Sequence, residues 1–321
     1  MDQEQAIASE KSVSSRRLPD GMSADGHDET KPVTFSYSQD NQPPIKRTLI
    51  RAIERASGQH SLKRLYEREI ASPARAQENF YDLVIEAMEL DVHLSQEQLD
   101  KIPTEGPVVF VANHPYGVLD GITLTWLARL RRPDVKVLAH RALCQIPKAQ
   151  ANLLPIDFDK TQEAQAITLN SRVRAQSHLR AGGAVGIFPG GGVATSLKPL
   201  RGRAVDPPWH PFTAKMIKGS KATVVPLYFS GQNSRLWQAA SHISYTLRQS
   251  LMFHETARRK GKRLDIVIGE PIPYEALKDY GDRQSMVQEL RRQTFALART
   301  IPGLPDSASD PDPVFEFPKN W

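Results

Sequence analysis

Cysteine is nearly absent from this sequence of 321 residues, which contains only Cys144. A single thiol cannot form an internal disulfide bond or, by itself, a thiolate metal site. Long apolar runs are absent too, because the longest candidates, Val108–Ala112 and Thr223–Phe229, have the length of a strand, whereas a membrane-spanning helix needs about 20 apolar residues. The first residues, Met-Asp-Gln-Glu, lack the pattern of a secretion signal. We therefore expect a protein of the reducing cytoplasm that does not span a membrane.

Several signatures of other enzyme classes are also missing. Neither Gly-x-Gly-x-x-Gly nor the Gly-Lys-Ser/Thr end of a P-loop occurs, so nucleotide binding is a weak alternative despite Gly182-Gly183 and the triplet at 190–192. The Gly-x-Ser-x-Gly elbow of serine hydrolases is absent. His254-Glu255 lacks the second histidine of a zinc-protease motif. No metal site is therefore predicted.

Basic side chains are in excess, with a formal net charge of +6 and a pI of about 9.3. This charge indicates an anionic partner, either nucleic acid or an acidic membrane surface. No signature of a nucleic-acid-binding fold accompanies the charge, so we do not expect nucleic acid as a partner.

The amino-terminal part of the chain is predicted to change character near residue 43. Residues 1–42 are polar and have few large apolar side chains, which predicts disorder. Residues 43–100 are predicted to form a helical extension. In its first helix, Ile45, Leu49 and Ile53 recur every four residues among basic side chains, so this amphipathic helix packs either on the domain or on a membrane surface. Further helices are predicted over Leu62–Ile70 and Phe80–Leu90.

Residues 101–300 are predicted to form an α/β domain. Compact apolar runs alternate with helical stretches, which favours a mixed, largely parallel sheet flanked by helices. Residues 301–321, rich in Pro and Asp, are expected to be an irregular arm. β-rich and helical runs alternate along Val108–Ala112, Ile122–Leu130 and Val135–Ala139, further strands are expected at Ala184–Phe188, Thr223–Phe229 and Leu264–Ile268, and further helices at Glu163–Leu179 and Pro211–Lys218.

The most informative local feature is the octapeptide Asn-His-Pro-Tyr-Gly-Val-Leu-Asp at residues 113–120, directly after a predicted strand. In open α/β sheets, the carboxyl ends of the strands form the edge where ligands bind. His114 and Asp120 would meet there, and a carboxylate that orients an imidazole makes a general base. The alternative is a capping aspartate and a histidine bonded to backbone.

The octapeptide resembles the catalytic block of the glycerolipid acyltransferase superfamily, in which a His and an Asp deprotonate the acceptor hydroxyl. Further blocks resemble the same superfamily in the same order, so the likeness spans about residues 80–275. It is closest to the 1-acylglycerol-3-phosphate and lysophospholipid acyltransferase-like branch, which also carries the name haemolysin. These blocks are Leu154–Asp157, Ile187–Gly191, Val224–Tyr228 and Ile268–Ile272.

The resemblance implies an O-acyltransferase with His114 as general base and Asp120 as its partner. The donor would be acyl-CoA or acyl carrier protein, the acceptor a lyso-lipid, and no cofactor or metal would be needed. Arg235 follows the Val224–Phe229 strand at the same edge and is expected to hold a phosphate or to form a structural ion pair. The substrate-binding residues predicted in this way are Asn113, Gly117, Asp157, Pro189, Gly190, Gly191, Gly192 and Arg235.

The sequence departs from the family pattern at several positions. Five residues rather than four separate His114 from Asp120, and one extra residue turns a helix by roughly 100°. Gly117 can adopt a positive φ and is expected to absorb this residue in the turn. Gly190 replaces the usual Glu, and Val193 stands where an Arg is usual. The second block has no Arg beside its Asp.

These losses bear on the acceptor. A phosphate monoester needs guanidinium groups or backbone amides, and only the Gly190–Gly192 amides and the nearby Lys198, Arg201 and Arg203 remain. Simple lysophosphatidic acid is therefore not the expected acceptor. A lyso-ornithine lipid or another lysophospholipid is expected instead. The alternative is a lipid-binding protein with this fold that has lost full activity.

A second amphipathic stretch lies near the carboxyl third of the chain. Ile243, Leu247 and Leu251 have helical spacing in a region rich in Lys and Arg. Such clusters bind anionic leaflets, although a solvated basic face over a core stripe is an equal alternative. We expect a peripheral protein on the cytoplasmic face of the inner membrane.

Overall fold

The computed structural model describes residues 36, 43–56, 58–159 and 161–318. The segment predicted to be disordered, residues 1–42, lies outside this part of the chain except for Ser36. No helix in the described ranges is both long and apolar enough to cross a bilayer.

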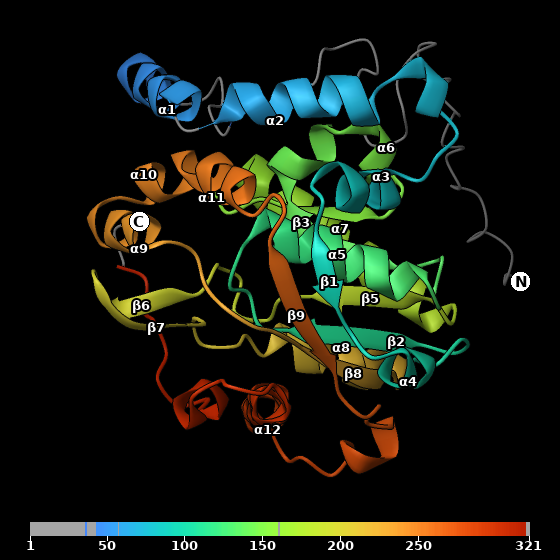
Figure 1. The fold of residues 1–321 in the computed structure, drawn as a ribbon. Helices are drawn as coiled ribbons and strands as arrows, with labels where there is room; N and C mark the ends of the chain where they lie inside the picture. The colour runs from blue at the N-terminus through green and yellow to red at the C-terminus, as the bar shows by residue number, and fades with distance from the viewer. Residues whose placement is uncertain (1–35, 37–42, 57, 160, 319–321) are drawn as a thin grey trace, which may run out of the picture. The chain divides into compact units, whose positions relative to one another are not determined.

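A seven-stranded sheet has the order β1-β9-β8-β2-β5-β3-β4 (Figure 1). Neighbouring strands are parallel except β8 and β9, which are antiparallel. The predicted mixed, largely parallel sheet flanked by helices is thereby confirmed. The strands are β1 (Asp91–His93), β2 (Val108–Ala112), β3 (Lys136–His140), β4 (Leu153–Ile156), β5 (Ala184–Ile187), β8 (Thr223–Phe229) and β9 (Arg263–Ile268), and a separate hairpin consists of β6 (Thr195–Lys198) and β7 (Arg201–Val205).

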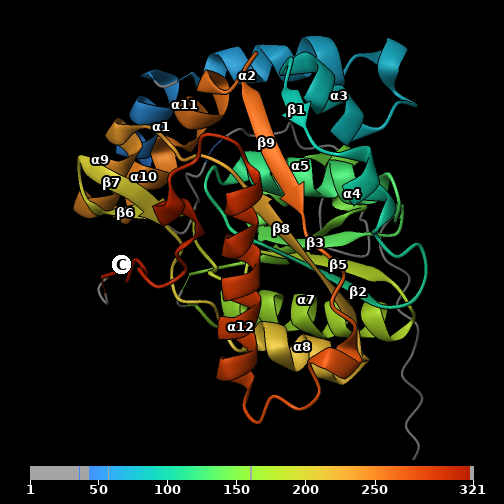
Figure 2. The same cartoon turned by 60° about the horizontal axis from the view of Figure 1, so that its bottom comes forward.

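Helices cover both faces of the sheet (Figure 2). Side chains of α3, α5 and α6 belong to the hydrophobic cluster on one face, and side chains of α7, α8 and α12 to the cluster on the other. The run Ile122–Leu130 is therefore the helical crossover between β2 and β3. The bounds are α3 (Phe80–Ala87), α5 (Val118–Arg129), α6 (Pro147–Gln150), α7 (Gln162–Arg180), α8 (Phe212–Ser220) and α12 (Arg283–Ala296).

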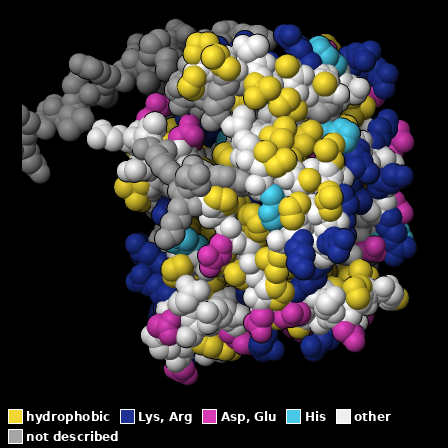
Figure 3. Space-filling view, turned by 90° about the vertical axis from the view of Figure 1, so that its left-hand side faces the viewer, with side chains coloured by type: hydrophobic (Ala, Val, Ile, Leu, Met, Phe, Trp, Pro, Cys, Tyr) yellow, Lys and Arg dark blue, Asp and Glu magenta, His cyan; other side chains and the backbone are white. Residues whose placement is uncertain are grey.

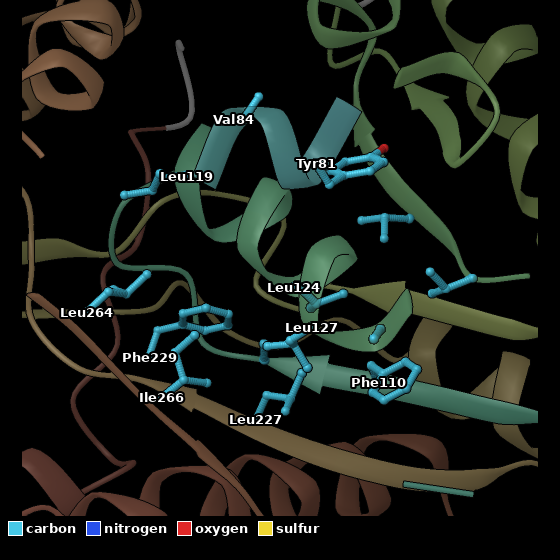
Figure 4. Close-up of a cluster of buried hydrophobic side chains, with 14 of the residues drawn as sticks. Tyr81, Val84, Phe110, Leu119, Leu124, Leu127, Leu227, Phe229, Leu264 and Ile266 are labelled. Carbon is cyan, nitrogen blue, oxygen red and sulfur yellow. The ribbon is translucent and has the colours of Figure 1, made fainter. Parts of the chain in front are cut away.

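The strand that precedes the candidate site, β2, is buried on both faces. Val109 and Val111 pack into one hydrophobic cluster, whereas Phe110 packs into the other. Successive side chains of a strand point to opposite faces, so a strand covered on both sides has a continuous apolar sequence. Figure 4 shows the cluster of Phe110 against Leu124 of α5. This packing holds the carboxyl end of β2 in a rigid frame.

The segment 43–100 is mainly helical, and it also contains a strand of the sheet. β1 pairs in parallel with β9, so this segment contributes a strand to the sheet in addition to its helices. Three mostly polar residues, Asp91–His93, gave no alternating pattern by which this strand could be predicted. The helices are α1 (Pro44–Ala56), α2 (Gln59–Leu65), a π-helical turn (Tyr66–Ile70), α3 and α4 (Gln96–Asp100).

Elements that were only partly predicted follow β5 and β8. The spacing of Ile243, Leu247 and Leu251 predicted one amphipathic helix, and the extended backbone of Ser244 divides this stretch into two short helices. The hairpin β6–β7 follows β5, and three short helices connect β8 to β9. We call the hairpin and these helices the cap. α9 packs against β6 and α10, and α10 packs against α1, as the grouping in Figure 1 shows. The helices are α9 (Arg235–Ile243), α10 (Tyr245–Ser250) and α11 (Met252–Arg258).

The expected irregular arm, residues 301–321, is described as far as residue 318. It contains one 3-10 turn, Asp306–Ser309, and residues 310–318 have no regular secondary structure. The backbone N–H of Phe315 donates to the carbonyl of Asp206 at 3.2 Å, so the arm returns to the candidate site.

Candidate active site

The residues selected from the sequence follow the carboxyl ends of parallel strands. His114 follows β2, the glycine turn at 190–192 follows β5, and Asp157 follows β4. Because β2, β5, β3 and β4 are parallel, their carboxyl ends meet at one edge of the sheet. His140, the last residue of β3, adds an imidazole at this edge that the sequence did not single out. The site therefore lies where open α/β sheets bind ligands.

His114 and Asp120 form a hydrogen-bonded pair, with Nδ1 of His114 3.0 Å from Oδ2 of Asp120. The same oxygen accepts hydrogen bonds from the backbone N–H groups of Tyr116, at 2.7 Å, and Gly117, at 2.9 Å. The Asp120 side chain is fully buried, whereas 16% of the His114 side chain is exposed. The carboxylate thus orients the imidazole and leaves Nε2 for a ligand.

The buried carboxylate of Asp120 is electrostatically unusual. Burial raises its pKa, because removal from water disfavours the charged form, and hydrogen bonds from His114, Tyr116 and Gly117 act in the opposite direction. Its second oxygen, Oδ1, has no hydrogen-bond partner among the described residues. This carboxylate is placed to stabilise the positive charge that an imidazole acquires when it takes up a proton, as a general-base dyad requires.

Gly117 absorbs the extra residue between the two partners. Its φ is +78°, a conformation that side chains rarely adopt, and it caps α5 with Asp120 in the first helical turn. A Cβ at this position would lie 2.7 Å from Sδ of Met252 and 3.1 Å from Cγ2 of Val193. The turn therefore requires glycine for its conformation and for its close packing, and the dyad geometry survives the five-residue spacing.

Two further residues position His114. The ring of Phe188 stacks on the imidazole, with ring centroids 4.0 Å apart and an interplanar angle of 20°. Oδ1 of Asp206 accepts a hydrogen bond from the backbone N–H of His114 at 3.1 Å, and Oδ2 accepts one from Nε1 of Trp209 at 2.9 Å. Burial raises the pKa of the Asp206 carboxyl, and nearby Arg291 lowers it.

Asp206 is a residue of the site that the sequence did not reveal. The contact joins residues 92 positions apart, through a hairpin whose existence was not predicted. No local pattern could have identified it.

A pocket of about 430 Å³ opens beside the dyad. His114, Gly117 and the turn at 189–192 line it, and its cationic side chains are Arg172 and Arg248. No acidic side chain lines it among the described residues. Such a pocket suits a ligand with an apolar chain and an anionic group. The apolar lining includes Leu138, Leu143, Ile156, Phe158, Phe188, Val193, Phe212, Met252 and Phe317.

The glycine turn presents backbone to the pocket. Gly191 has a φ of +64°, and its N–H donates to the carbonyl of Phe188 at 3.0 Å. A Cβ on Gly192 would lie 2.7 Å from the Phe317 ring, so glycine permits this close approach. The hydrogen bonds of the described residues leave the N–H groups of Gly190 and Gly192 without a protein acceptor. Both amides are available to an oxyanion.

Three residues predicted to bind substrate do not line the pocket, and the side chains of two of them form hydrogen bonds to backbone. Nδ2 of Asn113 donates to the carbonyl of Phe229 at 2.8 Å, and Oδ1 of Asn113 accepts from the N–H of Phe229 at 2.7 Å. Asn113 thus joins the ends of β2 and β8. Arg235 donates to the carbonyl of Gly202 in the hairpin at 2.6 Å, so its guanidinium is directed to the cap. For Arg235 the sequence allowed either a bound phosphate or a structural ion pair. The contact seen is structural, but the partner is a backbone carbonyl rather than a carboxylate.

Asp157 is the third of these residues. Its Oδ2 pairs with Nη1 of Arg141 at 2.6 Å, while its neighbours Ile156 and Phe158 line the pocket. The arginine that the second block lacks beside its Asp is thus supplied from the end of β3. The Asp157–Arg141 pair fixes the segment that follows β4, and the apolar residues on either side of Asp157 line the pocket.

The pocket cations differ from those expected near the glycine turn. Lys198, Arg201 and Arg203 belong to the hairpin and do not line the pocket, and Arg203 pairs with Asp310. Arg248 lines it instead, from α10. In the sequence Arg248 is one of many basic residues in its region, and only its burial distinguishes it.

No group of three or more His, Cys, Asp or Glu side chains within the described ranges is arranged to hold a metal ion.

The chain matches a family model described as acyltransferase over residues 75–303, and it belongs to this family. The predicted membership of the acyltransferase superfamily is thereby confirmed.

Two relatives with assigned activities are similar to this chain. The chain is 25% identical over 202 residues to a lyso-glycine lipid O-acyltransferase of Phocaeicola vulgatus, which covers 58% of this chain and 66% of the relative. It is 27% identical over 202 residues to the protein of the same name from Bacteroides thetaiotaomicron, covering 58% of this chain and 68% of that one. The match thus spans about two thirds of these relatives.

A solved structure is also similar to this chain. The crystal structure of the 1-acyl-sn-glycerophosphate acyltransferase PlsC from Thermotoga maritima gives a TM-score of 0.43 at 13% identity. The match covers 82% of this chain and 99% of that one.

Proposed function

We propose that this protein transfers a fatty acyl group from a thioester to the hydroxyl of a lyso-lipid. The observation that supports this most directly is the His114–Asp120 dyad at the wall of a largely apolar pocket. An apolar pocket suits acyl chains, and an oriented imidazole suits deprotonation of a hydroxyl. Membership of the acyltransferase family supports the same reaction.

In this reaction the acceptor hydroxyl is bound against Nε2 of His114. The imidazole takes the hydroxyl proton as the oxygen forms a bond to the thioester carbonyl carbon, and Asp120 stabilises the resulting imidazolium. The tetrahedral intermediate then collapses, the carbon–sulfur bond breaks, and the thiolate leaves and takes up the proton. A well-placed general base contributes about 10²–10⁴-fold to such a rate.

The intermediate carries negative charge on the former carbonyl oxygen. The N–H groups of Gly190 and Gly192 are our candidates for its hydrogen-bond donors, because they have no protein acceptor among the described residues and belong to the turn that lines the pocket. The donor in this proposal is acyl-CoA or acyl carrier protein, and the basic charge of the chain favours either of these acidic molecules.

The acceptor in this proposal is a lyso-lipid whose headgroup is not a simple phosphate monoester. Support comes from the missing family Glu and Arg at Gly190 and Val193 and from the two relatives named lyso-glycine lipid O-acyltransferase. A lyso-lipid with an amino-acid headgroup, of either the glycine or the ornithine kind, is the acceptor class that best combines these observations.

We further propose that α1 and the cap bind the cytoplasmic face of an anionic membrane. The apolar side chains of these elements include Ile45 and Leu49 on α1, Leu200 in the hairpin, and Leu236 and Ile243 on α9, each at least 55% exposed. Figure 3 shows hydrophobic side chains gathered on this side of the molecule beside many Lys and Arg. Apolar groups inserted among basic ones are the pattern of interfacial binding.

The pocket adjoins this proposed membrane face. α10, which lies between α1 and α9, contributes Tyr245, Arg248 and Gln249 to the pocket wall. A lyso-lipid in the leaflet would thus need to move only past α10 to reach His114.

The test compares the wild-type protein with His114→Ala. Each is incubated with radiolabelled acyl-CoA or acyl carrier protein and with lyso-lipids that differ in headgroup. We expect acylated product from the wild type and a rate at least about a hundredfold lower for His114→Ala. Equal product from both proteins would contradict the role of His114. Vesicle binding without any product would favour the lipid-binding alternative.

A further inference from the structure

Arg248 is a buried cation in the pocket wall, with only 4% of its surface exposed. Nη1 donates to Oγ1 of Thr195 at 3.2 Å, and Nη2 donates to the carbonyl of Val193 at 3.0 Å. The guanidinium also lies over two aromatic rings, 4.4 Å from the centroid of Trp237 and 4.8 Å from that of Phe317. These contacts hold the guanidinium in one orientation. All four partner groups are uncharged.

No acidic side chain within the described ranges forms an ion pair with Arg248. Arg132 offers a comparison, because it is equally buried and pairs with Asp134 at 2.9 Å. Burial lowers the pKa of the Arg248 guanidinium, and no carboxylate opposes this effect. A desolvated charge without a counter-ion is unfavourable, and an anion in the pocket would offset it.

Two residues, Val193 and Gly117, connect the guanidinium to the dyad. Nη2 of Arg248 is bonded to Val193, and Cγ2 of Val193 packs within 3.1 Å of where a Cβ of Gly117 would be. Gly117 in turn donates to Asp120. In a lyso-lipid the free hydroxyl is a few bonds from the headgroup, whereas the pantetheine arm of a thioester donor separates the reacting carbonyl from the nearest phosphate. The position of Arg248 therefore fits the acceptor rather than the donor.

We propose that Arg248 binds the oxyanion of the acceptor headgroup, a carboxylate or a phosphate, and thereby selects acidic lyso-lipids over neutral ones. This inference rests on the proposed function. Two of the five guanidinium N–H donors are used by Val193 and Thr195, and the remaining ones can form charge-assisted hydrogen bonds to the headgroup. Arg248 is then a specificity-determining residue contributed by the cap.

The kinetic test uses Arg248→Gln with acceptors in matched pairs. One pair is a lyso-lipid with a carboxylate headgroup and its methyl ester, and the other is lysophosphatidic acid and monoacylglycerol. We expect the ratio of kcat/KM for the charged over the neutral member to fall about 10- to 100-fold in Arg248→Gln, with the neutral member little changed. Arg248→Lys should give an intermediate ratio, because lysine keeps the positive charge but lacks the planar group that donates two parallel hydrogen bonds. The pair that responds identifies carboxylate or phosphate.

Arg132→Gln is the matched control, because it removes another buried guanidinium that does not line the pocket. It should lower stability and leave the charged-to-neutral ratio unchanged. An equal loss for both members of each pair in Arg248→Gln would show a merely structural role. A rise confined to the KM of the thioester donor would assign Arg248 to the donor. Either outcome would overturn the proposal.

A binding experiment separates this inference from the proposed function. His114→Ala and His114→Ala/Arg248→Gln are titrated with the same four lipids in neutral detergent micelles. We expect the charged lipids to bind His114→Ala at least about tenfold more tightly than their neutral counterparts, and the double variant to lose this preference. The result holds even if no acyl transfer is ever detected. No preference in His114→Ala would refute the role of Arg248. If the double variant does not fold, His114→Ala/Arg248→Lys replaces it and should lose part of the preference, because lysine keeps the charge but cannot form two parallel hydrogen bonds to the headgroup.

Discussion

The dyad turn and the cap contribute to the same pocket in different ways. His114 and Asp120 belong to one strand–turn–helix unit, and the backbone amides of Tyr116 and Gly117 within that turn complete their geometry. Arg248 comes from a short helix far along the chain, and its guanidinium donates hydrogen bonds to the hydroxyl of Thr195 in the hairpin and to the carbonyl of Val193, which follows the glycine turn. Residues that lie within one strand–turn–helix unit can be recognised from a sequence motif. A pocket residue that comes from a distant helix, such as Arg248, cannot be recognised in this way.

The strongest way to test the local unit is Asp120→Asn. We expect kcat/KM to fall about 10²–10⁴-fold, because the imidazole loses the charge that orients it and stabilises its protonated form. The rate of acyl transfer at saturating donor measures this. A double variant, His114→Ala/Asp120→Asn, should be no slower than His114→Ala, since the two residues act as one unit. Additive losses would contradict the dyad.

Gly117→Ala tests whether the turn geometry holds the dyad together. The substitution places a side chain at φ +78° and a Cβ 2.7 Å from Sδ of Met252. We expect the free energy of unfolding to fall by about 1–3 kcal/mol and kcat/KM to fall about 10- to 100-fold. Calorimetry and kinetics measure the two effects. Gly281→Ala, where nothing lies within 4 Å of the added Cβ, is the control and should change neither.

Asp206→Asn tests the contact between the dyad turn and the residues that follow the hairpin. Asn offers one acceptor where Asp206 uses two, so either the His114 N–H or the Trp209 indole N–H loses its partner. We expect stability to fall by about 1–3 kcal/mol, and kcat to fall about tenfold with KM nearly unchanged. Asp279→Asn, at an exposed carboxyl, should have no effect. A KM effect alone would instead assign Asp206 to ligand binding.

The smallest expected effect concerns the outer face of the cap. Ile243 is 72% exposed, and Ile243→Asp should weaken binding to anionic vesicles three- to tenfold by removing an inserted apolar group and adding a like charge. Vesicle sedimentation measures this. Leu130→Asp makes the same chemical change on a residue 49% exposed at the far end of α5, and it should leave vesicle binding unaltered. Equal effects of both changes would remove the cap from the proposed membrane face.

The strands nearest the site were predictable because they are buried on both faces. Val108–Ala112 and Thr223–Phe229 were predicted as strands and have those same bounds in the structure. β1 was not predictable, since its three residues depend on pairing with β9 for their conformation. Apart from the helical spacing of Ile243, Leu247 and Leu251, the cap was missed for a related reason. Its helices have only six to nine residues, and helices this short depend on tertiary packing rather than on intrinsic propensity.

The predicted site residues that agree with the structure are those that directly follow the ends of neighbouring parallel strands. His114, Gly117 and the turn at 189–192 meet at the pocket because the strands that precede them are parallel neighbours, and Asp120 is buried behind His114. Asn113 has the right place in the chain, but its side chain pairs with the backbone of Phe229 instead of facing the pocket. A position beside His114 in the chain does not specify the direction of a side chain.

The sequence by itself determined the family, the α/β architecture and the pairing of His114 with Asp120, because continuous apolar runs and short motifs act over a few residues. Only the tertiary structure decided that Asp206 supports His114 and that Arg248, among many basic residues, is the one buried in the pocket wall without a carboxylate. The physical reason is that burial and charge pairing depend on which distant elements pack together.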